Sequence, residues 1–266
     1  MEYIIKNITC SLLLSSLILF SCTPESSFDF QLPPEKIRYL KYVYEDDNLV
    51  KSFEYEGDRL IKYMAYSDND VSSIQFIYSE NGLVDSAYMV EKKIKRDLVF
   101  LYQDSLVSEL KVWMNNQLRY RIVFDRDRIG RIIRMSWINS NYGFVRDDYF
   151  VWDGYNITRQ ESKSYNGFDN PTDLYEFSNY DQLWNPYNTV FKKVGFNLLN
   201  FKPLPLSENN WVEMVYYKKG DYGNKVTCIN KFSYSGRYPY VNEFIVQDEN
   251  NRHQIYVEYN YKNTLH

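Results

Sequence analysis

Few residues in this sequence have side chains suited to acid–base or nucleophilic chemistry. There are two histidines, His253 and His266, and the second is the last residue given. A Ser-His-Asp triad needs one histidine between a serine and a carboxylate, so it would have to be built on His253, inside a predicted edge strand. Zinc needs three or four clustered Cys, His or carboxylate ligands, and no such spacing occurs. We therefore predict no catalytic set, no metal site and no cofactor.

Paired carboxylates are the remaining source of catalysis. Asp147 and Asp148 are adjacent, and a second acidic run spans residues 45–47. Two carboxyl groups can act as general acid and base in hydrolysis. We expect both runs to be solvated turn charges, and predict that the protein is not an enzyme. A hydrolase that uses scattered carboxylates is the alternative.

Aromatic rings are the other residues with a chemical use. The five tryptophans stand among Asn, Asp and Tyr side chains, as the flat rings of sugar-binding surfaces do. The alternative is that the same rings pack in the core or at an interface. The candidate ligand-binding residues are Trp113, Trp137, Trp152, Trp184 and Trp211.

A short recurring unit must position these side chains. It reads aromatic, any residue, aromatic, a four-residue polar break, then Leu or Ile, as in residues 53–60 and 76–83. Copies start at residues 53, 76, 100, 122, 150 and 175, so the period lies between 22 and 28 residues. A period in the twenties is typical of repeat architectures.

Each unit predicts a strand, a tight turn and a second strand. Phe53 and Tyr55 are two residues apart and share one face of a strand. Gly57 and Asp58 supply the backbone conformations that a hairpin turn needs. After the turn, regular alternation would place one set of side chains on the same face, namely Leu60, Lys62, Met64 and Tyr66.

The repeats predict an all-β fold. The loops are too short for parallel crossovers, so neighbouring strands must pair antiparallel. Charged residues interrupt the candidate strands, whereas a lipid-facing barrel needs an uncharged outer band. We predict a meander of about 12–16 strands, closed or nearly closed into a soluble barrel or curled sheet. It forms one domain over residues 37–266.

The alternation stops between residues 185 and 211. Apolar side chains from Tyr187 to Phe201 follow the spacing of three and four residues that is typical of a helix. Pro186 suits the first turn of a helix. We predict a non-strand insertion over residues 185–211 with one short helix, laid against the sheet or plugging its open end. A role in gating a ligand is the alternative.

The first residues have the features of an export signal. An apolar stretch over residues 8–20 is too short to span a membrane comfortably. It ends in Leu19-Phe20-Ser21-Cys22, which resembles the lipobox of bacterial lipoproteins. The resemblance implies a signal peptide over residues 1–21 and a diacylated Cys22, which begins a tether over residues 22–36. Two acyl chains give a stable anchor. By resemblance to other Gram-negative lipoproteins, Thr23 after the cysteine fits the outer membrane, with the periplasmic side and the cell-surface side as alternatives.

Cysteine content and charge limit the partners. Cys10 leaves with the signal and Cys22 carries lipid, so Cys228 has no partner for an intrachain disulfide. We expect Cys228 to be a buried thiol, with a reactive thiol as the alternative. The net charge of −4 disfavours a nucleic-acid partner, which would require a basic face.

Two further resemblances concern the repeats. The segment with Phe124-Asp125 and Gly130-Arg131-Ile132 resembles the Tyr-Asp repeats of large secreted toxins, which implies a β-hairpin array. The order of motifs along the chain also resembles a lipoprotein family from Bacteroides-type bacteria, of unknown function and porin-like fold. These motifs are the lipobox, the aromatic repeats, Tyr180-Asp181, Asn185-Pro186-Tyr187 and Leu206-Ser207-Glu208-Asn209-Asn210.

The family resemblance spans essentially the whole mature chain. It implies a fold and an address in the cell envelope, and it supplies no catalytic residues. We therefore expect a lipid-anchored envelope lipoprotein that acts as a binding or structural module. Its partners would be the membrane, through the lipid, and a glycan or an envelope protein. A subunit of a larger envelope assembly is the alternative.

Overall fold

Strand-forming residues with period-two alternation fold into one closed sheet in a computed structural model of the chain. The structure describes residues 38–67, 70–165, 173–191, 207–217, 225–248 and 251–262. The predicted signal peptide, the tether with Cys22, and His266 lie outside these ranges. One compact unit runs from Ile37 to His266.

Sixteen strands and one helix make up the described part of this unit. The first eight strands are β1 (Tyr39–Glu45), β2 (Asn48–Glu56), β3 (Arg59–Ser67), β4 (Asp70–Tyr78), β5 (Val84–Glu91), β6 (Ile94–Gln103), β7 (Leu106–Met114) and β8 (Gln117–Arg126). The others are β9 (Ile132–Asn139), β10 (Gly143–Asp153), β11 (Asn156–Ser164), β12 (Asp173–Ser178), β13 (Glu213–Tyr217), β14 (Lys225–Ser235), β15 (Tyr238–Gln247) and β16 (Arg252–Lys262). The helix α2 (Pro186–Phe191) lies between β12 and β13.

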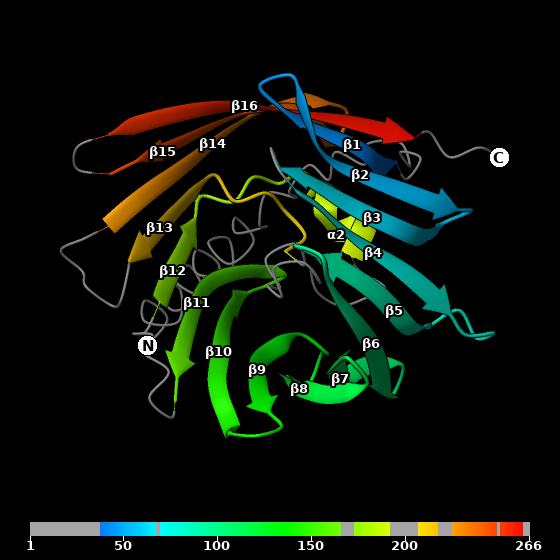
Figure 1. The fold of residues 1–266 in the computed structure, drawn as a ribbon. Coiled ribbons are helices and arrows are strands. Elements are labelled where there is room, and N and C mark those ends of the chain that lie inside the picture. Colours follow the sequence, from blue (N-terminus) through cyan, green and yellow to red (C-terminus); the bar gives the residue numbers. More distant parts are fainter. Residues whose placement is uncertain are drawn as a thin grey trace, which may run out of the picture. The chain divides into compact units, whose positions relative to one another are not determined.

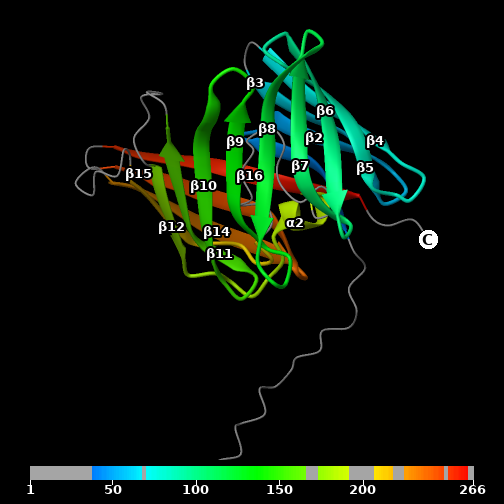
Figure 2. The ribbon, with the colours of Figure 1, turned by 90° about the horizontal axis from the view of Figure 1, so that it is seen from below.

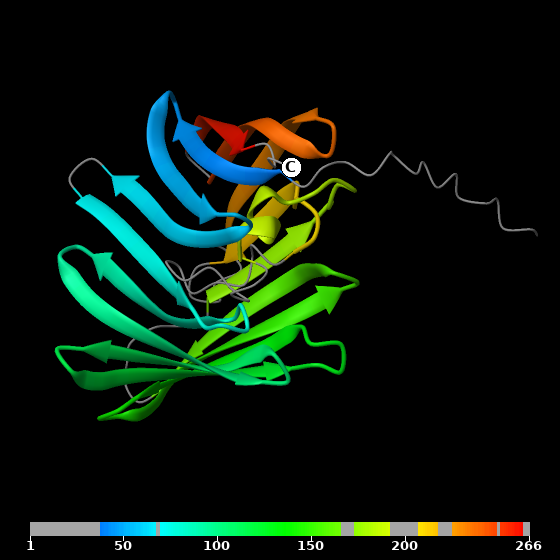
Figure 3. The same cartoon turned by 90° about the vertical axis from the view of Figure 1, so that its right-hand side faces the viewer.

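The sheet closes on itself. Each strand pairs antiparallel with its neighbour in sequence, and β1 pairs with β16 from Tyr39 opposite Lys262 to Glu45 opposite Val257 (Figures 1 and 3). The predicted all-β meander barrel with one short helical piece is confirmed. The strand predicted as an edge, β16, also pairs with β1 over residues 257–262, while His253 itself pairs with Val246 of β15.

The barrel has two ends with different connections. We call one end of the barrel the mouth end. It carries the turns β2–β3, β4–β5, β6–β7, β8–β9, β10–β11 and β14–β15, together with the β12–β13 connection. The far end carries the alternate turns. Several far-end and mouth-end turns have two successive residues at positive φ, such as Asp46-Asp47 and Asp104-Ser105. This geometry matches the right-handed twist of the flanking strands. Asp46 and Asp47 are exposed in such a turn, which confirms the prediction that they are solvated turn charges.

The strands carry apolar side chains inside and charged side chains outside. Phe53 faces Tyr63 across the strand pair with ring centroids 5.0 Å apart, and both are buried in the core. On the other face of the same strands, Glu54 and Lys62 form a salt bridge of 3.5 Å. The Glu109–Arg121 pair repeats this arrangement on β7 and β8. The core of the barrel is therefore apolar and its wall is charged.

One hydrogen bond recurs at the mouth end. The last inward side chain of a strand donates to a backbone carbonyl near the start of the preceding strand. We call these bonds the carbonyl belt. Its members include Tyr55 to Leu40 at 2.9 Å, Tyr78 to Leu60 at 2.8 Å, Tyr102 to Val84 at 2.7 Å, Trp152 to Ile132 at 2.7 Å and Tyr261 to Pro239 at 2.6 Å.

A β-bulge accompanies the belt. The register shifts between Glu54 and Tyr55 and again at the equivalent position of later hairpins. Because each bulge inserts one residue after the turn, Leu60 and Tyr63 are both buried inside although they are three residues apart. The predicted alternation that put Leu60 on the face of Lys62 is therefore wrong.

A polar cluster lies inside the barrel around Asp148. This carboxylate is fully buried and accepts hydrogen bonds from Trp137 Nε1 at 3.0 Å, Arg146 Nε at 2.8 Å and the Ser162 hydroxyl. Asp147 is also buried, on the opposite face. The prediction that both are solvated turn charges is wrong, because both are buried within β10. Tyr149 and Tyr165 donate to Oδ2 of Asp147.

The insertion begins with α2. The helix starts at Pro186, as predicted, and residues 192–206 of the predicted insertion lie outside the described ranges. Tyr187 projects into the core, where its hydroxyl accepts a hydrogen bond from Lys51 Nζ at 3.1 Å and its ring lies 6.3 Å from that of Tyr259. The helix therefore lies inside the ring of strands (Figures 1 and 2). In the described ranges no helix has the length and apolar character to cross a bilayer.

The carbonyl belt predicts a stability effect. Tyr78→Phe removes the bond to Leu60 and leaves a buried carbonyl without its donor, so the free energy of unfolding should fall by about 1 kcal/mol. Tyr88→Phe is the matched control, because this tyrosine is on the outer face and its hydroxyl has no hydrogen bond within the described ranges. Urea denaturation measures both. Equal stability of the two variants would contradict the belt.

The polar cluster predicts a larger effect. Asp148→Asn removes the charge that three donors share, and breaking a buried charged network costs about 3 kcal/mol of unfolding free energy. The control is Asp125→Asn on the outer face, where a half-exposed pair with Arg134 contributes less than about 1 kcal/mol. The same denaturation measurement compares them, and a loss for Asp148→Asn no larger than for the control would refute the role of the cluster.

Candidate functional site

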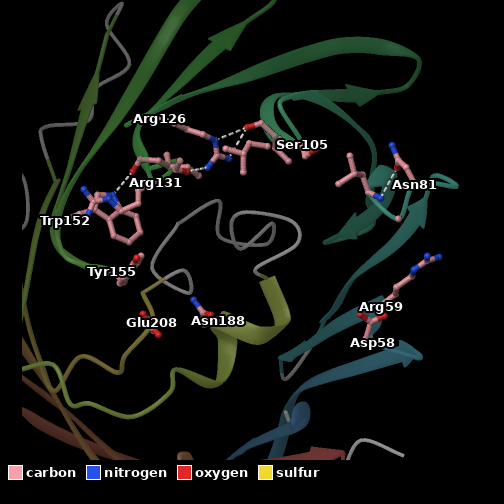
Figure 4. A pocket seen from close by; sticks show the side chains of 16 residues that line it. Asp58, Arg59, Asn81, Ser105, Arg126, Arg131, Trp152, Tyr155, Asn188 and Glu208 are labelled. Atoms are coloured by element: carbon pink, nitrogen blue, oxygen red, sulfur yellow. Dashed lines mark hydrogen bonds between the residues drawn. The ribbon is translucent and has the colours of Figure 1, made fainter. Parts of the chain in front are cut away.

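A cavity of about 1000 Å³ opens at the mouth end. Its walls come from five successive mouth-end turns, from β2–β3 to β10–β11, and from the insertion. We call it the mouth cavity (Figure 4). The lining residues that matter below are Asp58, Arg59, Arg126, Arg131, Trp152, Tyr155 and Glu208.

Backbone hydrogen bonds hold the insertion at this cavity. The Glu208 amide donates to the Tyr155 carbonyl at 3.1 Å, and the Ile157 amide donates to the Ser207 hydroxyl at 3.1 Å. The Trp184 amide donates to the carbonyl of Arg237, in the β14–β15 turn, at 3.1 Å. The insertion is therefore tied to two mouth-end turns, which places Glu208 in the cavity wall.

Two aromatic side chains line one side of the cavity. Trp152 is held by its belt bond, and the guanidinium of Arg131 lies 5.7 Å from its ring centroid, which covers part of the indole. Tyr155 follows in the β10–β11 turn and is 64% exposed. Tyr155 therefore offers the more accessible ring of the two (Figure 4).

Three arginines line the cavity. Arg131 is paired with Asp127, with Nε and Oδ2 2.6 Å apart. Arg126 donates to the carbonyls of Val107 and Gly130, and burial lowers the pKa of its guanidinium. The Arg59 guanidinium lies 5.6 Å from the ring centroid of Tyr78.

The cavity suits binding by hydrogen bonds and stacking. Asp58 and Glu208 add two carboxylates to the three arginines among the described lining residues. His253 and Cys228 lie on β16 and β14 and are not in the cavity wall. Among the described residues no cluster of three His, Cys, Asp or Glu side chains is placed to hold a metal ion. Cys228 is buried, as predicted, and burial raises the pKa of its thiol.

The five candidate tryptophans occupy five separate positions. Trp152 lines the mouth cavity, and Trp137 binds Asp148 inside the barrel. Trp113 is opposite Asp97 on the outer face. Trp184 packs edge-on against Tyr238, and Trp211 packs against Phe177 and Phe244. The structure does not bring them together into one platform.

The sequence analysis missed the other cavity residues. Tyr155, Arg59 and Arg126 lie in or beside turns, where hairpin geometry alone accounts for polar residues. The repeat pattern misplaced Arg126, because a copy that starts at residue 122 puts Phe124 at the second aromatic position. In the structure the register shifts between Asp125 and Arg126, as it does at Tyr55 and Tyr78, so Arg126 occupies the belt position. A charged residue at a belt position marks that repeat as different.

Comparison with known proteins concerns the fold. A porin-like protein from Bacteroides uniformis superposes with a TM-score of 0.54 at 11% identity, over 84% of this chain and 95% of that one. A porin-like protein from Bacteroides vulgatus gives 0.55 at 13% identity, over 85% and 99%. No protein-family model and no curated protein sequence matches the chain. At these identities, the chain shares a barrel fold with porin-like proteins from Bacteroides.

Proposed function

We propose that this protein is a lipid-anchored component of the cell envelope that binds a glycan in its mouth cavity. The observation that carries the proposal is the cavity itself. It combines an exposed tyrosine ring, an indole, arginines and carboxylates in a space of about 1000 Å³. Such a volume is at the upper end of the range for small-ligand sites.

The chemistry of the cavity favours a sugar over an apolar ligand. A sugar ring has an apolar face that stacks on an aromatic ring and a rim of hydroxyls that need donors and acceptors. Tyr155 supplies an exposed ring, Asn188 and Glu208 beside it supply donors and acceptors, and Arg59 supplies further donors on the other side of the cavity (Figure 4). An apolar ligand would cover the charged side chains of Arg59 and Glu208 without offering them hydrogen bonds, which costs binding free energy.

The wall of the barrel supports a water-facing position. A transmembrane barrel carries an uncharged band outside and polar groups within. Here the charged pairs Glu54–Lys62, Glu109–Arg121 and Asp125–Arg134 lie on the outer face, and the core is apolar. This arrangement is the reverse of a porin, so we propose that the lipid on Cys22 attaches the protein to the outer membrane.

Binding without catalysis fits the site best. Nucleophilic catalysis requires a nucleophile and a base within hydrogen-bond reach. Among the described lining residues the hydroxyls are Ser105 and Tyr155, and no histidine lines the cavity. We therefore propose a binding module, with no reaction assigned to it.

Tyr155 gives the direct test of glycan binding. Tyr155→Ala should weaken binding to glycans about fivefold, since stacking on an aromatic ring contributes on the order of 1 kcal/mol. The control is Tyr142→Ala, which removes a tyrosine of similar exposure, 63%, from the far end. Binding is measured on a glycan array with the full chain solubilised from membranes in detergent. Loss of binding in both variants, or in neither, would argue against the mouth cavity.

The anchor is tested separately. Cys22→Ala should abolish incorporation of radiolabelled palmitate and release the protein from the membrane fraction, because two acyl chains are needed for stable attachment. Cys228→Ala is the control and should leave labelling unchanged, since that thiol is buried. Persistence of label in Cys22→Ala would disprove the lipobox assignment.

A further inference from the structure

We infer that the glycan bound in the mouth cavity is acidic, and that Arg126 binds its carboxylate, sulfate or phosphate group. This inference rests on the proposed glycan-binding function and names the class of ligand. It is carried by the position, the hydrogen bonds and the charge of Arg126.

Arg126 occupies a position where the fold needs a neutral donor. At the equivalent place in other hairpins, Tyr55, Tyr78 and Tyr102 each donate one hydroxyl proton to a carbonyl of the preceding strand. Arg126 donates to the carbonyl of Val107 in the same way, from Nε at 3.3 Å and Nη2 at 3.0 Å. Since a tyrosine satisfies this belt position elsewhere in the same barrel, the structural bond does not require the positive charge.

The remaining donors of Arg126 are available to a ligand. A guanidinium has five N–H groups, and the structure uses three of them, two on Val107 and one on Gly130 at 2.7 Å. All three acceptors are neutral carbonyls. The part of the chain that the structure describes gives Arg126 no salt bridge, although the guanidinium is half-buried. A partly desolvated charge that lacks a counter-ion is costly, and a ligand anion would offset that cost through charge-assisted bonds.

The surroundings of Arg126 favour an anion. Arg59 lines the same cavity, and within the described ranges it too has no salt bridge, whereas the charge of Arg131 is already met by Asp127. The cavity wall thus holds three arginines and two carboxylates among its described residues, in a protein whose net charge is −4. With Asp127 beside Arg131 the local charges balance, so the mouth lacks the net negative charge of the whole molecule, which would repel an anion.

The two carboxylates fit the sugar part of the same ligand. Figure 4 shows Glu208 beside Tyr155 and Asn188, and Asp58 beside Arg59, with Arg126 and Arg131 on a different part of the wall. Glu208 can accept hydrogen bonds from sugar hydroxyls next to the exposed ring of Tyr155. The acidic group would then lie against Arg126, at a separate subsite of one cavity.

The test uses glycan pairs that differ in one acidic group. The full chain, solubilised in detergent, is applied to an array of uronate, sulfated and phosphorylated oligosaccharides, each beside its neutral counterpart. Wild-type protein should bind at least one acidic member about tenfold or more tighter than its neutral partner, as expected for a hydrogen-bonded charge pair. This comparison uses the wild-type protein alone. The uronate, sulfated and phosphorylated pairs show which acidic group is recognised.

Arg126→Tyr separates the charge from the structural bond. The variant keeps a donor for the Val107 carbonyl, so its unfolding midpoint should stay close to that of wild type, while the preference for the acidic member is lost. Arg134→Tyr is the matched control, because it removes an arginine from the outer face, where that side chain pairs with Asp125. The control should retain the full preference for the acidic member.

Three outcomes decide between the two proposals. A preference for acidic glycans that disappears in Arg126→Tyr and persists in Arg134→Tyr supports the inference. Equal binding of acidic and neutral members, lost in Tyr155→Ala, overturns the inference and leaves glycan binding in place. Absence of binding to every glycan, or binding of inorganic sulfate or phosphate alone, overturns both proposals.

Discussion

The carbonyl belt is the constraint on which the mouth end depends. Each belt bond joins the end of one strand to the start of the strand before it, and the bulge opposite the donor turns the first residue after the hairpin turn inward. The bond satisfies a carbonyl that faces an apolar core, where an unpaired group would be costly. Because the device recurs around the ring, successive turns end at the same level, and the walls of one cavity can be built from five hairpins.

This barrel has an apolar inside and a charged outer wall, whereas a transmembrane pore has a polar inside and an apolar outer band. Apolar side chains such as Phe53 and Phe76 fill the inside, and Tyr187 of α2 packs among them. Polar groups occur inside mainly where partners satisfy them, as around Asp148. The mouth cavity lies where the turns and the insertion bring charged and aromatic side chains to the edge of the apolar core.

Period-two aromatic spacing and short loops were enough to predict the antiparallel meander, and the helical spacing that follows Pro186 predicted the short helix. It could not predict the bulges, because an inserted residue changes the face of Leu60 without changing any residue type. It also could not predict the burial of Asp147 and Asp148, because their donors Trp137, Ser162 and Tyr165 lie outside β10 and come close only through strand pairing. The cavity residues could not be predicted either, because they lie in different hairpins that are brought around one cavity only when the sheet curls into a barrel.

Closure between β1 and β16 has a consequence for how the chain folds. The seam joins Tyr39 to Lys262, so it cannot form until nearly the whole sequence has been synthesised and delivered. Contacts between such distant residues make folding slow, and until they form the sheet has two unpaired edges that can recruit other chains. Pairing of the eleven-residue strand β16 with β1 thus closes the sheet and removes both unpaired edges. A chain truncated before β16 would keep both edges open.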